Sequence, residues 1–515
     1  MKRYVYILAL GGIMMTGMSS CSDFLDENPM SNFTRYNYFK NTDQAKTAVD
    51  GAYERLRALT NGAGYGESAW VTLDLLCGHA TSNAQSLYNN TYIKHTAGTM
   101  NSAFGDMWNG FYEGIADCNL CIDGMKDMDK DETAVLKGEV YALRAFYYFY
   151  LTRLYGDIPL ILEPVSSDSP LMYPEKSSQE TIFNSILNDL IEAEKAGLPE
   201  NDENGRVSLG FVKTLLADVY QYMAGYPLNK GKEYYKKAYE KADEVLAKSY
   251  CVSPNDASYN SSKAKSALYS LFDSYDKLHD KTNKNKGEMI FQIQFSASAD
   301  ATNSITSLIV PTGTPITKVY DKFGSLIPTN EFIDSYEQGD KRATEQGMFF
   351  SSYPNVDDNS KTETFSPSLY KYFDVEAVAT GKCDLNFTLY RLPELMLIYA
   401  ESYTMANDNP DQKSYDMVNA IRNRAGLSSL QGLSKDDFIQ AVWKERAHEL
   451  CYENKEYFDI QRTHKAYNLS SGRFEDYDSF ANESGTTFSE KYLLWPIPST
   501  ETDVNPKLLP NNKGW

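Results

Sequence analysis

The stretch EVYALRAFYYFYLTRLYGDIPL, residues 139–160, decides the fold class of this chain. Apolar and aromatic residues recur through it at helical spacing. Gly156 and Pro159 then end the pattern, because glycine favours the turn after a helix and proline prevents its continuation. Ala145 and Tyr148 share one face, so a neighbouring helix can approach the small residue while the ring fills the adjoining groove. The stretch therefore predicts a long helix packed between other helices.

The same spacing of a small and an aromatic residue recurs along the chain. It appears at residues 217–220 and 400–403, and more loosely at 112–116, while similar partner helices are expected at 235–242 and 415–421. This pattern resembles degenerate tetratricopeptide helical hairpins, which stack into a curved scaffold. We therefore expect a predominantly α-helical protein with a tetratricopeptide-like helical-hairpin scaffold.

Between residues 252 and 385 the composition shifts to Ser, Asn, Asp, Gly and Pro. Short apolar or alternating runs at 289–295 and 307–310 are typical of strands. We expect a long irregular excursion containing a few short strands. The predicted organisation is a signal peptide at 1–20, an N-terminal helical region with the repeats at 21–251, the excursion at 252–385, and a C-terminal helical region with its tail at 386–515.

The N-terminus carries the features of a secretion signal and a lipid anchor. Lys2 and Arg3 precede a short apolar run at 5–18, and Ser19-Ser-Cys21 follows. Small residues before a cysteine suit a lipoprotein signal peptidase, so we expect acyl chains on Cys21 to hold the protein on a membrane. An ordinary cleaved signal with a chance cysteine is the alternative. No later run offers about 20 uncharged apolar residues, the length that a membrane span requires.

The charge of the chain excludes nucleic acid as a partner. Lys and Arg total 50 against 70 Asp and Glu, which gives a formal net charge of −20, and no basic cluster occurs. Such a surface would repel a polyanion.

Motifs for catalysis and metal binding are incomplete. His448-Glu-x-x-Tyr452 lacks the second imidazole of a zinc site, and the acidic run 127–131 lacks the glycine and the final carboxylate of a calcium loop. Cys118 and Cys121 form a lone CxxC in a helical pattern and are expected to be buried, unpaired thiols. We expect no enzyme activity, no catalytic residue, no metal and no cofactor. A glycosidase pair among the 70 carboxylates stays open by counting alone.

Seven segments, in order along nearly the whole mature chain, resemble the SusD/RagB family of outer-membrane nutrient-binding lipoproteins. They are residues 21–29, 108–119, 139–160, 390–401, 418–427, 445–462 and 494–506. Each segment alone is a weak signal, whereas seven in the family's order are specific. The turn at 452–455 and Trp495 depart from the family pattern without affecting the expected fold.

The resemblance implies a helical body that docks against a SusC-like TonB-dependent outer-membrane transporter, captures oligosaccharides and passes them in. The acidic segment 22–27 resembles the export tag of surface lipoproteins. We therefore expect a lipid-anchored protein on the outer membrane that faces the cell exterior. Three alternatives stay open: peptide capture of the RagB kind, a surface hydrolase, and a purely structural helical-repeat adaptor.

Charged residues within these segments are expected to hold helices together. They lie on helix faces among apolar residues, and they are Arg144, Glu401, Arg422, Arg424, Glu445, Glu449 and Arg462. We expect inter-helix ion pairs and hydrogen bonds rather than ligand contacts. The ligand site is accordingly expected in loops outside the repeats.

Two loop segments combine aromatic rings with amide or carboxylate groups, as binding of a sugar ring requires. The first holds Trp70, Asp74, His79, Asn83, Tyr88, Asn89, Asn90 and Tyr92, and the second holds Phe349, Phe350, Tyr353, Asn355 and Asp357. Trp70 is the leading candidate. Packing in the core or within a loop is the alternative for each ring. Two or three such platforms predict weak capture of a glycan.

Overall fold

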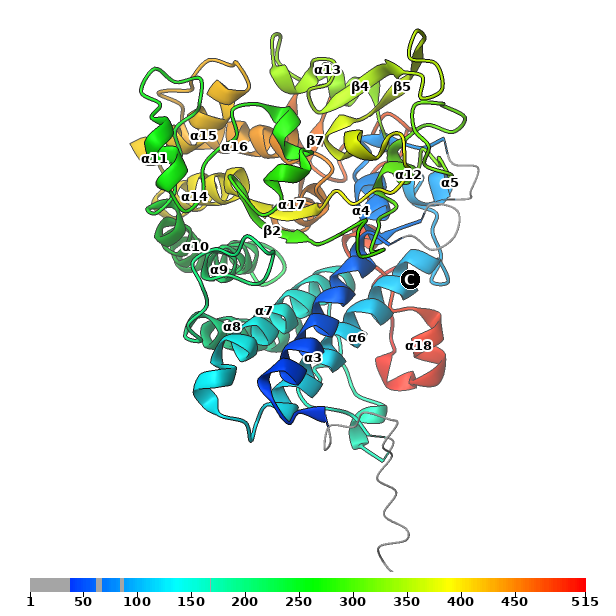
Figure 1. Ribbon diagram of the computed structural model, residues 1–515, viewed down its shortest axis with the longest axis vertical. Helices are drawn as coiled ribbons and strands as arrows, with labels where there is room; N and C mark the ends of the chain where they lie inside the picture. Colours follow the sequence, from blue (N-terminus) through cyan, green and yellow to red (C-terminus); the bar gives the residue numbers. More distant parts are fainter. Residues whose placement is uncertain (1–37, 62–66, 84–87, 167) are drawn as a thin grey trace, which may run out of the picture.

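The computed structural model describes residues 38–61, 67–83, 88–166 and 168–515 (Figure 1). The predicted signal peptide, Cys21 and the acidic segment 22–27 lie outside these residues. The described helices are α3 (Thr42–Glu54), α4 (Ala69–Cys77), α5 (Tyr88–Ile93), α6 (Ser102–Gly124), α7 (Lys130–Tyr155), α8 (Gln179–Glu194), α9 (Leu209–Ala224), α10 (Lys232–Leu246), α11 (Ser261–Ser266), α12 (Ile305–Ile309), α13 (Asn330–Asp334), α14 (Leu392–Asn407), α15 (Gln412–Arg424), α16 (Lys435–Glu449), α17 (Glu456–Thr463) and α18 (Ser499–Val504). The strands are β1 (Ala80–Thr81), β2 (Met289–Ile293), β3 (Ile327–Pro328), β4 (Phe349–Pro354), β5 (Thr362–Leu369), β6 (Phe387–Arg391), β7 (Lys465–Asn468) and β8 (Arg473–Asp476).

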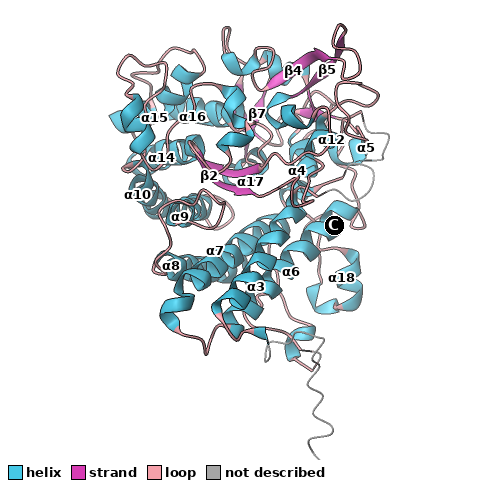
Figure 2. Cartoon of the chain, viewed as in Figure 1, coloured by secondary structure: helices cyan, strands magenta, loops and turns pink. Residues whose placement is uncertain are grey.

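Stacked helices form the body of the protein. α3 contacts α6 and α7, and contacts then run from α7 through α8 and α9 to α10. α10 packs against α14, although the whole excursion separates them in sequence, and α14 contacts α15 and α16. Figure 2 shows the strands in the upper part of the molecule, where β2 and β7 lie near α14 to α16, and β4 and β5 lie toward α12. The predicted fold, a tetratricopeptide-like helical scaffold with short strands, is confirmed.

α7 is the central helix of the N-terminal half. The Asp129 carboxylate accepts hydrogen bonds from backbone N–H groups at the first turn, and Gly156, with φ of 73°, ends the helix. Every side chain from residue 142 to 155 is buried. α6 approaches so closely that a Cβ atom on Gly114 would lie 2.7 Å from the ring of Tyr147. This packing therefore requires glycine at position 114.

The excursion leaves the helical body and returns to it through a short sheet. β2 pairs antiparallel with β6, so the two ends of the excursion lie side by side. β4 and β5 form a hairpin, while β1 pairs with β3 and joins the N-terminal loop to the excursion. The prediction of a strand at 307–310 is wrong, because residues 305–309 form the helix α12. Ile305, Leu308 and Ile309 are buried at helical spacing.

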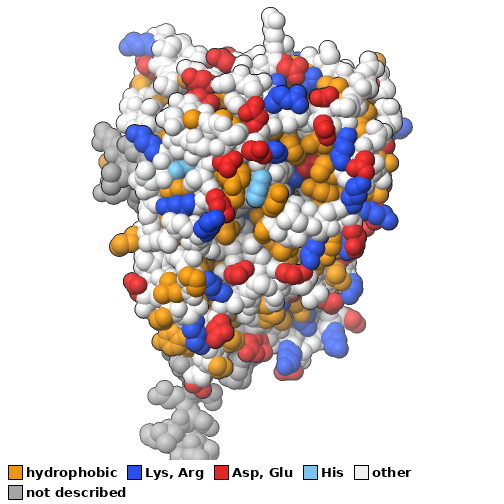
Figure 3. Space-filling view, turned by 180° about the vertical axis from the view of Figure 1, so that it is seen from behind, with side chains coloured by type: hydrophobic (Ala, Val, Ile, Leu, Met, Phe, Trp, Pro, Cys, Tyr) orange, Lys and Arg blue, Asp and Glu red, His pale blue; other side chains and the backbone are white. Residues whose placement is uncertain are grey.

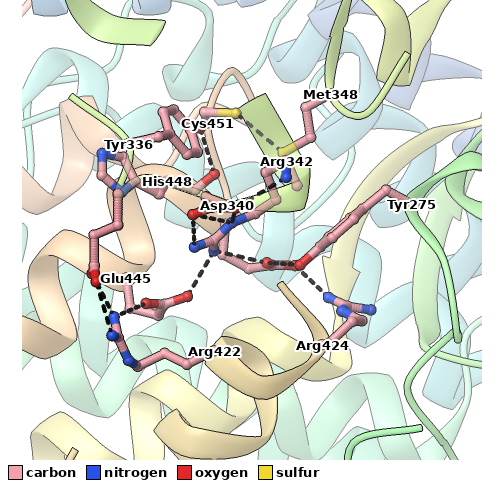
Figure 4. Close-up of polar contacts among 12 residues, drawn as sticks. Tyr275, Tyr336, Asp340, Arg342, Met348, Arg422, Arg424, Glu445, His448 and Cys451 are labelled. Atoms are coloured by element: carbon pink, nitrogen blue, oxygen red, sulfur yellow. Dashed lines mark hydrogen bonds and ion pairs between the residues drawn. The ribbon is translucent and has the colours of Figure 1, made fainter. Parts of the chain in front are cut away.

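A buried network of charged side chains joins the excursion to α15 and α16 (Figure 4). The Glu449 carboxylate lies 2.5 Å from the guanidinium groups of Arg391 and Arg424 and 3.2 Å from that of Arg342. Arg342 also binds Glu445, one turn earlier in α16, at 2.6 Å. Burial alone would raise the pKa of Glu449, but the charges of Arg424, Arg391 and Arg342 lower it below its usual value. The carboxylate is therefore ionised in the core.

The other charged residues expected to hold helices together do so. Arg144 of α7 binds Asp189 of α8 at 2.7 Å. Arg462 of α17 binds Glu401 of α14 through two nitrogens, one of them at 2.8 Å. Arg422 of α15 contacts Glu445 at 3.4 Å, as Figure 4 shows. The prediction of inter-helix ion pairs is confirmed.

Cys118 and Cys121 are buried, unpaired thiols on α6, as predicted. None of the helices described combines the length and the apolar character that crossing a bilayer requires. Across residues 38–515, apart from the gaps given above, no three His, Cys, Asp or Glu side chains gather as a metal site would need.

Burial of the histidines makes the fold sensitive to acid. It lowers the pKa of His79 and of His279 from 6.5 to about 4, and that of His448 well below 6.5. The pKa values of His95 and His464 are also lowered by burial. Unfolded histidines take up protons near pH 6.5, whereas these folded ones do so only at lower pH. Their contribution to stability is therefore complete above about pH 6.5 and is lost as the pH falls toward 4.

Replacing Glu449 by Gln is expected to lower the free energy of unfolding by about 3–5 kcal/mol, because three buried guanidinium groups lose their shared counter-charge. Urea denaturation followed by circular dichroism measures the change. Glu490→Gln is the matched control, since Glu490 pairs with Lys513 at 2.6 Å on the surface. Its cost should stay below about 1 kcal/mol. Equal losses in both variants would contradict the importance of the buried network.

The melting temperature is expected to decline between about pH 6.5 and 4, and His279→Gln should flatten that decline. A buried imidazole whose pKa falls from 6.5 to about 4 weakens the fold by about 3 kcal/mol at low pH, and glutamine does not titrate. Scanning calorimetry from pH 7.5 to 4 provides the measurement. Parallel curves for the variant and the wild type would rule out this origin of the acid sensitivity.

Candidate functional site

Trp70 lies in the core of the protein. Its side chain is 0% exposed, and its indole N–H donates to the carbonyl oxygen of Tyr452 at 2.9 Å. The ring packs edge-on against Tyr372 and Phe387, with ring centroids 5.0 and 5.3 Å away. All residues of α4 are buried. The expectation that Trp70 is exposed is wrong, because a ring without exposed surface offers no face to a sugar.

Asp74, His79 and Tyr92 are buried as well, which also differs from the prediction. The Asp74 carboxylate accepts a hydrogen bond from the Asn454 side-chain amide at 3.1 Å, and burial raises its pKa well above its usual value. The His79 ring packs edge-on against Phe332 at 5.1 Å, and Tyr92 is 0% exposed. Asp74 and His79 thus join α4 and the segment after it to later parts of the chain, whereas Tyr92 packs against Phe104 of α6.

The aromatic residues of the second predicted loop belong mainly to the β4–β5 hairpin and its core. Phe349 and Phe350 are buried, contrary to the expectation of an exposed surface. Tyr353 is half-buried, with its ring centroid 5.0 Å from that of Phe373. The hairpin turns these rings inward because the residues that follow, including Phe373, cover that side.

Three predicted residues of the first loop, unlike those above, are not shown to be buried. Asn83 is exposed just beyond β1. Tyr88 and Asn90 lie in α5, which contacts β1, but their side chains fall outside the described part of the chain. Their role in ligand binding stays a prediction.

One segment of the excursion, residues 311–324, is bonded to both predicted loop segments. The Asn83 N–H donates to the carbonyl oxygen of Gly324 at 2.7 Å, and the Val356 N–H donates to that of Pro315 at 2.9 Å. Residues 311–324 therefore lie between Asn83 on one side and the turn at 355–358 on the other. Gly324 has φ of 56°, and a Cβ atom there would lie 3.2 Å from the Asn83 side chain.

Tyr320, in the middle of this connecting segment, is 96% exposed. The other exposed aromatic residues of the described chain are Tyr173, at 50%, and Tyr226, at 42%. Sequence reasoning missed Tyr320. Tyr320 lies among charged residues in the run KVYDKFGS at 318–325, but so does Phe323, which is half-buried, so this pattern alone does not identify the exposed ring.

Backbone hydrogen bonds hold the chain on both sides of Tyr320. The Lys318 N–H donates to the carbonyl oxygen of Val378 at 2.7 Å, and the Phe323 N–H donates to that of Ser307 at 2.9 Å. The ring thus projects into solvent from a segment whose backbone is fixed to the body of the excursion.

Polar and charged residues lie on the segment that carries this ring and on the two loops bonded to that segment. We define the Tyr320 surface as Asn83, Lys318, Tyr320, Asp321, Lys322 and Asp357. Lys318 and Asp357 form an ion pair. Partial burial and the nearby charge of Lys318 lower the pKa of Lys322. The surface therefore combines one open aromatic face with an amide, a paired charge and a cation.

Such a surface suits a ligand with an apolar face and a polar edge. Stacking of a sugar ring that buries about 100 Å² contributes roughly 2.5 kcal/mol, and hydroxyl groups can bond to the amide and charged groups at its edge. On the face that Figure 3 shows, acidic and basic side chains are interspersed and form no basic patch that would gather a polyanion.

Comparison with known proteins identifies the family. Residues 339–515 match the SusD family, and residues 23–220 match the family described as starch-binding associating with outer membrane. SusD-like protein P2 of Formosa agariphila is 26% identical, and the alignment covers 100% of both chains.

Solved structures agree with this match. Surface glycan-binding protein A from Bacteroides thetaiotaomicron, in complex with laminarihexaose, has the same fold at 20% identity, with a TM-score of 0.70 over 91% of this chain and 99% of that one. A SusD superfamily protein from Parabacteroides distasonis is 34% identical, with a TM-score of 0.84 over 94% of this chain and 100% of that one. With this identity along nearly its whole length, the chain belongs to the SusD/RagB family.

Proposed function

We propose that this protein captures glycans at the cell surface and delivers them to a SusC-like TonB-dependent transporter. The observation that carries the proposal is Tyr320, a ring that is 96% exposed on a segment fixed by backbone hydrogen bonds. The fold that the chain shares with surface glycan-binding protein A, which was solved in complex with laminarihexaose, supports it. Aromatic platforms beside amide and charged groups suit neutral sugars.

The proposal is capture without cleavage. A glycosidase needs two carboxyl groups that face each other across the scissile bond, one as acid and one as base or nucleophile. On the Tyr320 surface, the Asp357 carboxylate is already paired with Lys318. This leaves Asp321 without an evident carboxylate partner among the residues that define this surface.

The expected affinity is low. One stacked sugar ring contributes roughly 2.5 kcal/mol, while a millimolar dissociation constant already requires roughly 4 kcal/mol after the cost of association. Tyr320 therefore needs neighbouring contacts, and we propose that Asn83 and α5 supply them. Weak binding allows cargo to be released to a transporter.

Tyr320→Ala is expected to weaken glycan binding at least tenfold, because it removes the open stacking face, while the melting temperature should change little for so exposed a side chain. Isothermal titration calorimetry with laminarihexaose, maltohexaose and xylohexaose, and in parallel with a peptide mixture, measures the affinity. Tyr320→Phe should retain binding, since it keeps the ring.

Tyr173→Ala is the matched control, because Tyr173 is also exposed but lies on another surface. Unchanged affinity in Tyr320→Ala would move the site elsewhere. Binding of peptides but of no oligosaccharide would favour the RagB type of cargo instead.

We further propose that acyl chains on Cys21 hold the protein on the outer membrane, facing outward. The match of residues 23–220 to the family described as starch-binding associating with outer membrane supports the location. The acidic segment 22–27 next to the cysteine supports the outward side.

Cys21→Ser is expected to abolish metabolic labelling with radioactive palmitate and to release the protein from the membrane fraction, because a single residue carries the anchor. Cys118→Ser is the control, since Cys118 is buried and unpaired. Equal labelling of the Cys21 variant and the wild type would exclude this cysteine as the anchor.

A further inference from the structure

Two helix ends meet away from the Tyr320 surface and present a pair of stacked rings. Tyr226 follows the end of α9, and His464 follows the end of α17. Their rings are parallel to within 5°, with centroids 3.6 Å apart. The Tyr226 N–H donates to the carbonyl oxygen of Arg462 at 2.9 Å, which joins the two ends directly.

The backbone at this junction is closely fitted. A Cβ atom on Gly225 would lie 2.2 Å from the carbonyl oxygen of Arg462, so the approach requires glycine. The ring of His464 packs edge-on against Tyr477, with centroids 5.4 Å apart. His464 is thus held from two sides, yet the Tyr226 ring stacked on it remains 42% exposed.

A hollow of about 280 Å³ opens beside the stacked rings. Its lining includes Gln179, Tyr226, His464, Glu490, Leu494 and Lys513. Glu490 and Lys513 form an ion pair at 2.6 Å. Gln179 opens α8 and donates its side-chain N–H to the carbonyl oxygen of Thr152 at 3.0 Å. The amide oxygen of Gln179 has no hydrogen-bond partner among the contacts of the described residues.

The size and chemistry of this hollow restrict its ligand. Pockets for small organic ligands hold about 300–1,000 Å³, so a hollow of about 280 Å³ lies at the lower limit of this range and suits a single sugar ring. A flat aromatic face with an amide and a neutralised ion pair at its edge matches the C–H face and the hydroxyl groups of a pyranose. Glu490 and Lys513 neutralise each other, while Lys491, which also lines the hollow, adds one cation.

We propose that this hollow, the Tyr226 site, is a second saccharide-binding site. A pyranose ring stacks on Tyr226, and its hydroxyl groups bond to Gln179 and to the Glu490–Lys513 pair. None of its lining residues belongs to the Tyr320 surface, so the two sites bind independently. The inference rests on the proposed glycan-binding function and adds a second location to it.

The test uses saturation-transfer difference NMR on the full chain with whichever of laminarihexaose, maltohexaose and xylohexaose the wild type binds. In a Tyr320→Ala background, a residual ligand signal is expected from the Tyr226 site. Adding Tyr226→Ala should reduce that signal at least fivefold, whereas Tyr226→Phe should preserve it because the stacking ring remains. Tyr173→Ala in the same background serves as the control and should leave the signal unchanged.

Other results would overturn the second site. A residual signal that Tyr226→Ala leaves unchanged, or complete loss of signal in Tyr320→Ala alone, overturns the second site and leaves the proposed function standing. An equal loss with Tyr173→Ala shows an unspecific effect and also overturns it. If the wild type binds none of the three oligosaccharides, the proposed function fails, and the second site fails with it.

Discussion

The meeting of three guanidinium groups at the carboxylate of Glu449 is the contact on which the rest of the structure depends. Arg391 ends β6, Arg424 ends α15, and Arg342 lies within the excursion, so each cation comes from a different part of the chain. Taking each charge out of water costs several kcal/mol, which only a complete set of partners offsets. A partly assembled network would therefore be unstable. The excursion and the C-terminal helices must take up their positions together.

This requirement separates the recognisable residues from the binding surface. The charged residues by which the chain resembles its family hold helices and strands together. The pairs of Arg144 with Asp189 and of Arg462 with Glu401 are examples. A side chain enclosed in this way has almost no exposed surface to offer a ligand. Ligand binding must then depend on exposed residues that the scaffold supports. These residues lie outside the segments that resemble the family.

The sequence pattern predicted those features that residues close together in the chain determine. The helix at 139–155 is encoded by the spacing of its apolar residues and by its end signals, and its place between neighbouring helices follows from its small residues.

The burial of Trp70, in contrast, could not be predicted from the residues around it. Its hydrogen-bond partner Tyr452 is 382 positions away, and no pattern around either residue reveals that contact. Tyr320 was missed for a related reason: whether a ring is exposed depends on what fails to pack over it, and only the folded chain shows that. The prediction of a strand at 307–310 was wrong because a short apolar run fits a strand and a buried helix equally well.

Both proposed sites present a tyrosine ring from a backbone that hydrogen bonds hold in place. Around Tyr320 the hydrogen bonds of Lys318 and Phe323 hold the segment, and at Tyr226 the bond to Arg462 does so. The Tyr320 ring faces solvent, whereas the Tyr226 ring stacks on His464 and remains 42% exposed. A ring on a fixed backbone loses little freedom when a ligand stacks on it, so most of the stacking energy goes into binding. Tyrosine suits this position, because its hydroxyl group tolerates water while its face stays apolar. A rigid helical body with a few such rings can hold a sugar chain weakly without closing around it.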